Sequence, residues 1–210
     1  QDEFIKRITE VNKNTIVVLT TGSPVLMDKW LDNVDGLIEA WFAGEQAGNA
    51  IAEVLLGETN PSGKLPMTFP KRWEDCSAYN SYKKLDSTTI YEDGIYVGYR
   101  HFEKNNIQPL FPFGFGLSYT TFKYNDLKLS SKEITKNDKL TVTLNVKNTG
   151  SVKGSEVVQL YVKDVQSSID RPVKELKAFN KVRLNPGEEK IVEVHSTPIE
   201  QHLLQRRVGG

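Results

Sequence analysis

The sequence predicts an α/β segment followed by an all-β segment, and three observations support this fold class. In residues 1–70, helix-spaced apolar residues alternate with continuous β-branched runs, which is typical of a mostly parallel sheet covered by helices. Near the C-terminus, apolar and polar residues alternate one by one between turn signals, as in the half-buried strands of a β-sandwich. Between the two lies a stretch that is dense in aromatic residues and weak in periodicity.

The α/β segment is expected over residues 1–70. Its predicted elements are a helix, a strand, a short amphipathic piece, a second buried strand and a helix, at residues 4–11, 15–21, 25–31, 36–42 and 47–56. Gly57 stands where a helix C-terminus favours a left-handed residue. Two strands are too few for a stable sheet, so we expect this segment to be part of a larger three-layer α/β sandwich.

Residues 71–122 are expected to form a connector. Pro and Gly interrupt this stretch repeatedly, which argues against long regular elements. The aromatic residues on and beside it are Tyr79, Tyr82, Tyr91, Tyr96, Tyr99, Phe102, Phe111, Phe113, Phe115, Tyr119 and Phe122. A long irregular stretch with so many aromatic side chains is expected to pack on the α/β segment as an ordered connection.

Residues 123–195 are expected to form a β-sandwich of fibronectin III or immunoglobulin type. Four strands are predicted, at residues 140–146, 157–162, 176–184 and 190–195, with turns at residues 148–151 and 185–188. Arg171 and Glu175 flank a turn and are expected to form a local ion pair. Residues 196–210 show no strand-like alternation and are expected to be an irregular tail, which leaves the sandwich incomplete. An incomplete sandwich exposes a strand edge that can pair with a second copy, so a homodimer is one expectation.

Composition excludes several classes of partner. Lys and Arg together number 27, as do Asp and Glu, so no net field attracts nucleic acid and no nucleic-acid partner is expected. The chain has no run of about 18 apolar residues, so no membrane span is expected. Cys76 is the single cysteine and cannot form an internal disulfide; we expect an ordinary packed residue there rather than a nucleophile.

No cofactor or metal is expected. The loop at residues 20–24 follows a strand but lacks the glycines and the lysine of a phosphate cradle. His101, His195 and His202 are too widely separated in sequence to suggest a metal site. The chain begins Gln-Asp-Glu, without Met and without an apolar leader, so we expect an excised or processed chain whose compartment stays open.

Three groups of motifs resemble, in order, family 3 glycoside hydrolases of the β-glucosidase type. The first comprises AWFAGEQAGNAIA at residues 40–52 and GETNPSGKLPMTFP at residues 57–70. The second comprises YEDGIYVGYR at residues 91–100 and PFGFGLSYTTF at residues 112–122, and the third RPVKEL at residues 171–176 and NPGE at residues 185–188. The resemblance implies that residues 1–70 are the C-terminal half of the family's α/β-sandwich domain and that a fibronectin III-like domain follows the connector.

The resemblance also implies an activity, the retaining hydrolysis of a terminal β-linked glucose or a related sugar. Such chemistry uses two carboxylates about 5 Å apart, one as nucleophile and one as acid/base. In the family, the nucleophilic Asp lies on an N-terminal barrel and the acid/base Glu on a loop that precedes a segment resembling residues 1–5. We therefore assign no catalytic residue in this sequence and expect the chain alone to be inactive. An oligosaccharide or glucoside would reach it through the barrel of a parent enzyme.

Four residues are expected to lie near the sugar. Tyr91, Glu92 and Asp93 would approach the cleft between domains, although an ordinary acidic turn closed by Gly94 explains them as well. Trp73 is a candidate platform for stacking on a sugar ring. Trp41 is expected to be a core residue, and Glu45 suits the positive end of a helix dipole.

A second function from a different class stays open at this point. Without the two catalytic carboxylates, the chain could act as a non-catalytic carbohydrate-binding or protein-interaction module. Its binding surface would then be the aromatic connector or the open edge of the sandwich. Titration with oligosaccharides distinguishes this hypothesis from the enzyme hypothesis.

Overall fold

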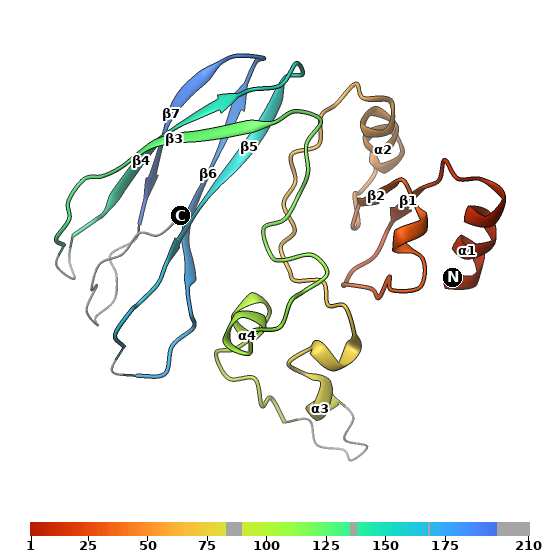
Figure 1. Cartoon of the computed structure of the whole chain (residues 1–210), viewed down its shortest axis with the longest axis horizontal. Helices are drawn as coiled ribbons and strands as arrows, with labels where there is room; N and C mark the ends of the chain where they lie inside the picture. Colours follow the sequence, from red (N-terminus) through yellow and green to blue (C-terminus); the bar gives the residue numbers. More distant parts are fainter. Residues whose placement is uncertain (83–89, 135–137, 168, 197–210) are drawn as a thin grey trace.

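The computed structural model describes residues 1–82, 90–134, 138–167 and 169–196 (Figure 1). An α/β part and a β-sandwich lie on opposite sides of an irregular connector. This arrangement confirms the predicted fold class, α/β followed by all-β. Within the described ranges, no helix combines the length and the apolar character needed to cross a membrane.

The α/β part is built around a two-stranded parallel sheet. Its elements are α1 (Asp2–Val11), β1 (Ile16–Leu19), the 3-10 helix η1 (Leu31–Asn33), β2 (Gly36–Glu39) and α2 (Ala47–Leu56). Val17 lies opposite Leu37 in the β1–β2 register. Helix α2 ends at Gly57, whose φ of 77° confirms the predicted left-handed cap.

Two predictions for the α/β part were wrong in detail. The second strand ends at Glu39 rather than at residue 42, because Trp41 adopts a left-handed φ of 50°. The Glu39 carboxylate accepts a hydrogen bond from the Trp41 N–H at 2.9 Å, which fixes this turn. The amphipathic piece expected at residues 25–31 gives only the short η1, while its Met27 and Trp30 are buried in the core beside Phe69.

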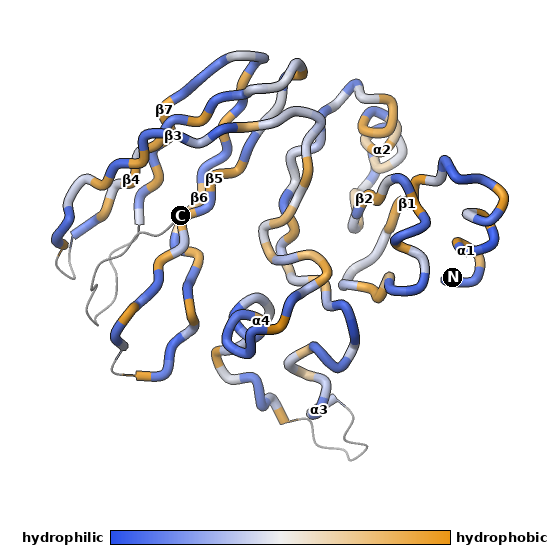
Figure 2. The backbone as a smooth tube through the Cα atoms, in the orientation of Figure 1, coloured by the Kyte–Doolittle hydropathy of each residue, from blue (hydrophilic) through white to orange (hydrophobic). Residues whose placement is uncertain are grey.

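Several large apolar side chains of the α/β part are exposed. The predicted stripe on α1 exists, but Phe4 is 68% exposed and Val11 is 87% exposed. Phe42 and Leu56 are 78% and 75% exposed. Hydrophobic segments on α2 and its neighbours are visible at the outside of this part in Figure 2. The two-stranded sheet therefore has apolar neighbours that the described residues do not bury.

In its described residues, the connector contains three short helices, η2 (Trp73–Asp75), α3 (Tyr79–Tyr82) and α4 (Tyr99–Lys104). The chain before the connector and the last stretch of the connector itself run side by side (Figure 1). Leu65 donates its N–H to the Phe115 carbonyl and accepts the Gly114 N–H at its own carbonyl, both at 2.8 Å. Phe69 and Phe111 form an isolated antiparallel bridge. The aromatic residues at 111 and 115 thus pack against the core of the α/β part.

The β-sandwich has two antiparallel sheets. One has the order β3-β4-β7 and the other pairs β5 with β6. The strands are β3 (Phe122–Leu129), β4 (Thr141–Asn148), β5 (Gly154–Val162), β6 (Glu175–Leu184) and β7 (Glu189–His195). Val146 and Leu184 are fully buried between the sheets, and the one-by-one alternation predicted for β4 is present. The buried Asn148 side chain donates to the Val152 and Leu184 carbonyls and so pins the β4–β5 turn.

Strand β3 was not predicted from the sequence. Its alternation is broken where the register shifts between Asn125 and Lys128, and Asp126 there takes a left-handed φ of 54°. The tail expected at residues 196–210 lies outside the described residues except for Ser196, as does His202. Ser196 is buried and its N–H donates to the Leu140 carbonyl at 2.9 Å.

Candidate functional site

Tyr91, Glu92 and Asp93 lie in one turn that precedes α4, here called the 91–94 turn. Gly94, with a φ of 55°, closes the turn, and the Tyr96 N–H donates to the Asp93 carbonyl at 2.9 Å. Tyr91 is 86% exposed. The Oδ1 atom of Asp93 is buried, and no described residue donates a hydrogen bond to it. The turn therefore presents an aromatic ring outward and holds one carboxylate oxygen inward.

Trp73 lies in η2 and is 38% exposed. Tyr79 and Tyr82 contact its ring edge-to-face, with centroid distances of 6.0 and 5.9 Å. Arg72 and Asp75 hold η2 in place through a 2.6 Å ion pair, which also lowers the pKa of the Asp75 carboxyl below its usual range. The ring is thus fixed by its neighbours while part of its surface stays open.

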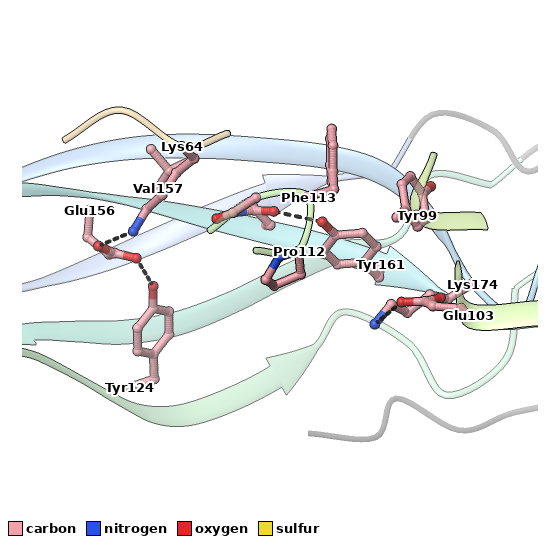
Figure 3. A pocket seen from close by; sticks show the side chains of 12 residues that line it. Lys64, Tyr99, Glu103, Pro112, Phe113, Tyr124, Glu156, Val157, Tyr161 and Lys174 are labelled. Carbon is pink, nitrogen blue, oxygen red and sulfur yellow. Dashed lines mark hydrogen bonds and ion pairs between the residues drawn. The ribbon is translucent and has the colours of Figure 1, made fainter. Parts of the chain in front are cut away.

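An open pocket of about 430 Å³ lies between the connector and the sandwich (Figure 3). Tyrosine, lysine and glutamate side chains line most of it, together with Pro112 and Phe113. Burial raises the pKa of Tyr161 to about 12, with the charge of Glu103 adding to the effect. The described residues contain no group of His, Cys, Asp and Glu side chains that could hold a metal ion. The pocket is therefore an amphipathic crevice between two parts of the chain.

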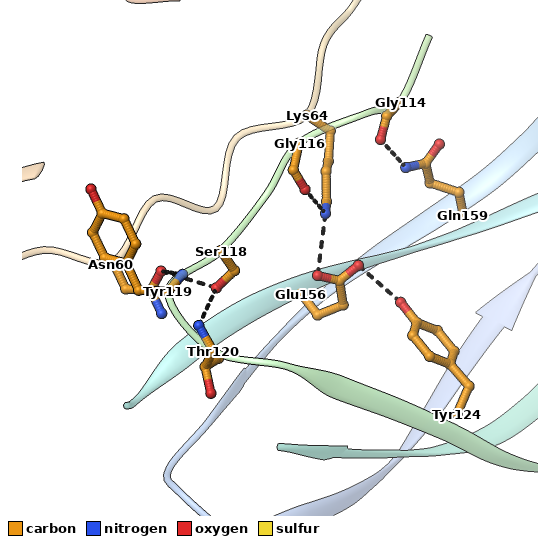
Figure 4. A network of polar contacts seen from close by, with 10 residues as sticks. All are labelled: Asn60, Lys64, Gly114, Gly116, Ser118, Tyr119, Thr120, Tyr124, Glu156 and Gln159. Atoms are coloured by element: carbon orange, nitrogen blue, oxygen red, sulfur yellow. Dashed lines mark hydrogen bonds and ion pairs between the residues drawn. The ribbon is translucent and has the colours of Figure 1, made fainter. Parts of the chain in front are cut away.

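A polar network centred on a largely buried ion pair lines one end of this pocket (Figure 4). Lys64 donates to the Gly116 carbonyl at 2.8 Å and to Glu156 Oε2 at 3.2 Å. Tyr124 donates its hydroxyl to the other oxygen of Glu156 at 3.0 Å. The pKa of Tyr124 is raised, first by burial and then by the Glu156 carboxylate. The side chains of Lys64 and Glu156 are only 17% and 13% exposed, so this ion pair joins the two parts largely out of water.

Helix α4 closes the other end of the pocket against the sandwich. Glu103 accepts from Lys174 at 2.8 Å, and Arg100 pairs with Glu175 at 3.0 Å. The local pair expected between Arg171 and Glu175 is therefore wrong, because Glu175 is taken by a residue far away in sequence and by the nearby Lys177. Glu175 thus pairs with Arg100 across the packed interface rather than with Arg171, which is close to it in sequence.

The two carboxylates that line the pocket do not form a hydrolytic pair. Glu156 and Glu103 each bind a lysine, at opposite ends of the pocket. The rings of Tyr161, Phe113 and Pro112 lie between them (Figure 3). A retaining hydrolase needs its two carboxyl groups about 5 Å apart with the sugar between them. The pocket lacks that arrangement.

The comparison with protein families decides which family this is. A model described as the glycosyl hydrolase family 3 C-terminal domain matches residues 1–119. The chain belongs to glycosyl hydrolase family 3. A second model, described as a fibronectin type III-like domain, matches residues 156–201. Both matches confirm the resemblance read from the motifs.

Relatives of this family 3 chain are similar along most of its length. The thermostable beta-glucosidase B of Acetivibrio thermocellus is 49% identical over 192 residues, which cover 91% of this chain and 25% of the relative. A probable beta-glucosidase I of Aspergillus niger is 48% identical and is covered to 24%. The family 3 chain thus spans about a quarter of the length of the curated relatives it matches.

Solved structures share the fold of the family 3 chain. Beta-glucosidase 3B from Thermotoga neapolitana in complex with glucose is 41% identical, with a TM-score of 0.83 over 93% of this chain and 28% of that one. Beta-glucosidase from Kluyveromyces marxianus in complex with glucose is 42% identical, with a TM-score of 0.84 over 92% of this chain and 23% of that one.

Sequence reasoning missed the network that joins the two parts of the family 3 chain. Lys64 is the one charged residue in the stretch PSGKLPMTFP, and Glu156 directly precedes the apolar strand residues of β5. A lone charge of each sign beside apolar runs is a weak signal for a buried pair. Only the packing of the two segments shows that the charges meet.

Proposed function

We propose that this family 3 chain is a structural part of a retaining β-glucosidase-type hydrolase. It contributes one wall of the sugar cleft and a stabilising sandwich, and it does not hydrolyse glucosides alone. The observation that supports this proposal is the unfinished α/β part, a two-stranded parallel sheet whose apolar neighbours lie exposed. Parallel sheets are normally covered on both faces, so this part fits beside further strands and helices of a longer protein.

The carboxylates at the pocket support the proposal that the isolated chain is inactive. Glu103 and Glu156, the carboxylates at the pocket, are each ion-paired and separated by aromatic rings. Neither therefore has an open path to a leaving oxygen across a bound sugar. The nucleophile and the acid/base would be supplied by polypeptide outside these 210 residues.

We further propose that Tyr91, Glu92, Asp93 and Trp73 lie near the sugar in the assembled enzyme. Tyr91 and Trp73 expose ring surface that can stack on a pyranose. The proposed domain limits are residues 1–70 for the α/β part, 71–122 for the connector and 123–195 for the sandwich. A homodimer through the sandwich edge is also proposed, and sedimentation velocity of the chain tests it.

The test is a chimera. This chain replaces the matching quarter of the Acetivibrio thermocellus relative, and release of nitrophenol from aryl β-glucoside is measured. The chimera is expected to be active, whereas the purified chain and the relative truncated before this segment are expected to be inactive. A chimera that folds, by circular dichroism and gel filtration, but releases no nitrophenol contradicts the proposal.

A second candidate function is favoured by one observation, the exposed aromatic surface around Trp73, where Tyr82 is 76% exposed. In this case the chain alone binds oligosaccharides without cleaving them. The test is a titration with cello-oligosaccharides that is monitored by tryptophan fluorescence. The spectrum of the unmodified chain is expected to change on binding, and this change is expected to be lost in the Trp73→Phe variant. If millimolar ligand leaves the fluorescence spectrum of the unmodified chain unchanged, the chain does not bind through Trp73 and this function is contradicted.

A further inference from the structure

Asp170, on the sandwich loop that leads into β6, binds two side chains of the connector. Its carboxylate accepts hydrogen bonds from the Tyr96 hydroxyl and from Lys104, whose Nζ lies 3.1 and 3.3 Å from the two oxygens. Lys104 Nζ also lies 3.4 Å from the centre of the Tyr96 ring, in a cation–π contact. Each of the three side chains thus contacts the other two. We call this group the Asp170 clip.

The clip acts directly on the 91–94 turn. Tyr96 donates its backbone N–H to the Asp93 carbonyl at 2.9 Å, so the residue that Asp170 holds is itself bonded to the turn. Gly94, with its φ of 55°, is the point at which this stretch turns. The backbone of Tyr96 therefore connects the clip to Asp93.

The rest of α4 is attached to the sandwich as well. Tyr99 accepts the Leu176 N–H at its hydroxyl at 3.0 Å, while Arg100 and Glu103 form the ion pairs with the sandwich described above. On the connector side, His101 lies 3.2 Å from the Asp75 carbonyl, and the Tyr99 ring packs on Phe113 at a centroid distance of 5.0 Å. Besides the clip, three polar contacts thus attach α4 to the sandwich.

We propose that Asp170 is a positioning residue that fixes the 91–94 turn for the sugar, so that the sandwich contributes to substrate affinity as well as to stability. This inference rests on the proposed function, because that proposal places the turn near the substrate. Asp170 itself lies in the sandwich and touches Tyr96 and Lys104, so it acts through them. Charge and hydrogen bonding are both needed: the carboxylate faces one cation and one hydroxyl donor.

The first experiment measures the turn in the chain itself. Hydrogen exchange at the amide of Tyr96 is compared among the unmodified chain, Asp170→Ala and Asp170→Glu. Loss of the clip is expected to speed this exchange about three- to tenfold, and the Glu variant is expected to restore much of the protection. Glu193→Ala is the control, because Glu193 is an exposed carboxylate on β7 that takes no part in the clip. If the Tyr96 amide exchanges at the same rate in Asp170→Ala and in the control, the proposal that the Asp170 clip holds this turn is refuted.

The second experiment measures substrate binding in the chimera. Asp170→Ala is expected to raise KM about three- to fivefold while kcat changes less than about twofold. Tyr96→Phe is expected to do the same, and the double variant is expected to be no worse than either single one, because all three break one unit. Unchanged KM in an active chimera overturns the positioning role. An inactive parent chimera counts against the proposed function, whereas the clip is still decided by the exchange experiment.

Discussion

Replacing Lys64 with Met removes the ammonium group that joins the α/β side of the molecule to the sandwich. Met is an unbranched apolar side chain of similar length, so the change removes mainly the charge and its hydrogen bonds. Among the described residues, Glu156 would then retain the Tyr124 hydroxyl as its one donor, and the Gly116 carbonyl would lose its lysine. A carboxylate that is 13% exposed would be left without a counter-charge.

The expected cost follows from this burial. Removing one partner of a buried ion pair costs about 3–5 kcal/mol, and the partial access of water here places Lys64→Met near about 3 kcal/mol. For a chain of this size, that corresponds to a fall in the melting temperature of about 6–12 °C. Lys29→Met is the matched control, because the Lys29–Asp2 pair has the same 3.2 Å separation but exposures of 68% and 45%. Its expected cost is below about 1 kcal/mol.

Urea unfolding provides the measurement. The three tryptophans, Trp30, Trp41 and Trp73, all precede the sandwich, so their fluorescence reports on the α/β side while circular dichroism follows the strands. Adding Glu156→Gln to Lys64→Met is expected to recover at least about 1 kcal/mol, because the amide carries no buried charge. Equal losses in Lys64→Met and Lys29→Met would refute the argument that burial makes this pair important.

Three further predictions concern local structure. Gly57→Ala is expected to cost about 1 kcal/mol because φ is 77° there, as measured by urea midpoints; no loss would mean that the helix ends differently. Val146→Ala, at a fully buried position, is expected to cost about 2–3 kcal/mol, against less than about 1 kcal/mol for Ile191→Ala on the exposed face. Arg72 lowers the pKa of the Asp75 carboxyl in the folded chain, so ionised Asp75 stabilises the fold. This contribution to the free energy of unfolding is complete above the ordinary carboxyl pKa of about 3.9 and is lost as pH falls through the pKa of the folded state. Asp75→Asn should therefore reduce the stability difference between pH 6 and pH 3; an unchanged difference would contradict this assignment.

Much of the fold could be predicted because its signals are local. Helix α2 and its glycine cap follow from apolar spacing and one residue with a left-handed preference. Strand β4 follows from strict alternation between core and surface. The strand after the connector, β3, was missed because its register shift interrupts that alternation. The early end of β2 was missed because the left-handed Trp41 depends on a side-chain contact with Glu39.

The candidate site could be predicted only in part, because its contacts are distant in sequence. Motifs pointed to the 91–94 turn and to Trp73, and the structure places the turn before α4 and Trp73 in η2. The partner of Glu175 turned out to be Arg100, 75 residues away, and Tyr96 pairs with Asp170, 74 residues away. Local spacing carries no information about which charged side chains meet across a packed interface.

Hydrolysis of aryl β-glucoside by the purified chain tests the central claim most directly. The account predicts no nitrophenol release above the blank from the chain alone, and release from the chimera in which the rest of a family 3 enzyme surrounds it. Reproducible turnover by the chain alone would contradict the account, because catalytic carboxylates would then lie within these residues; its loss in Glu156→Gln or Glu103→Gln would identify them.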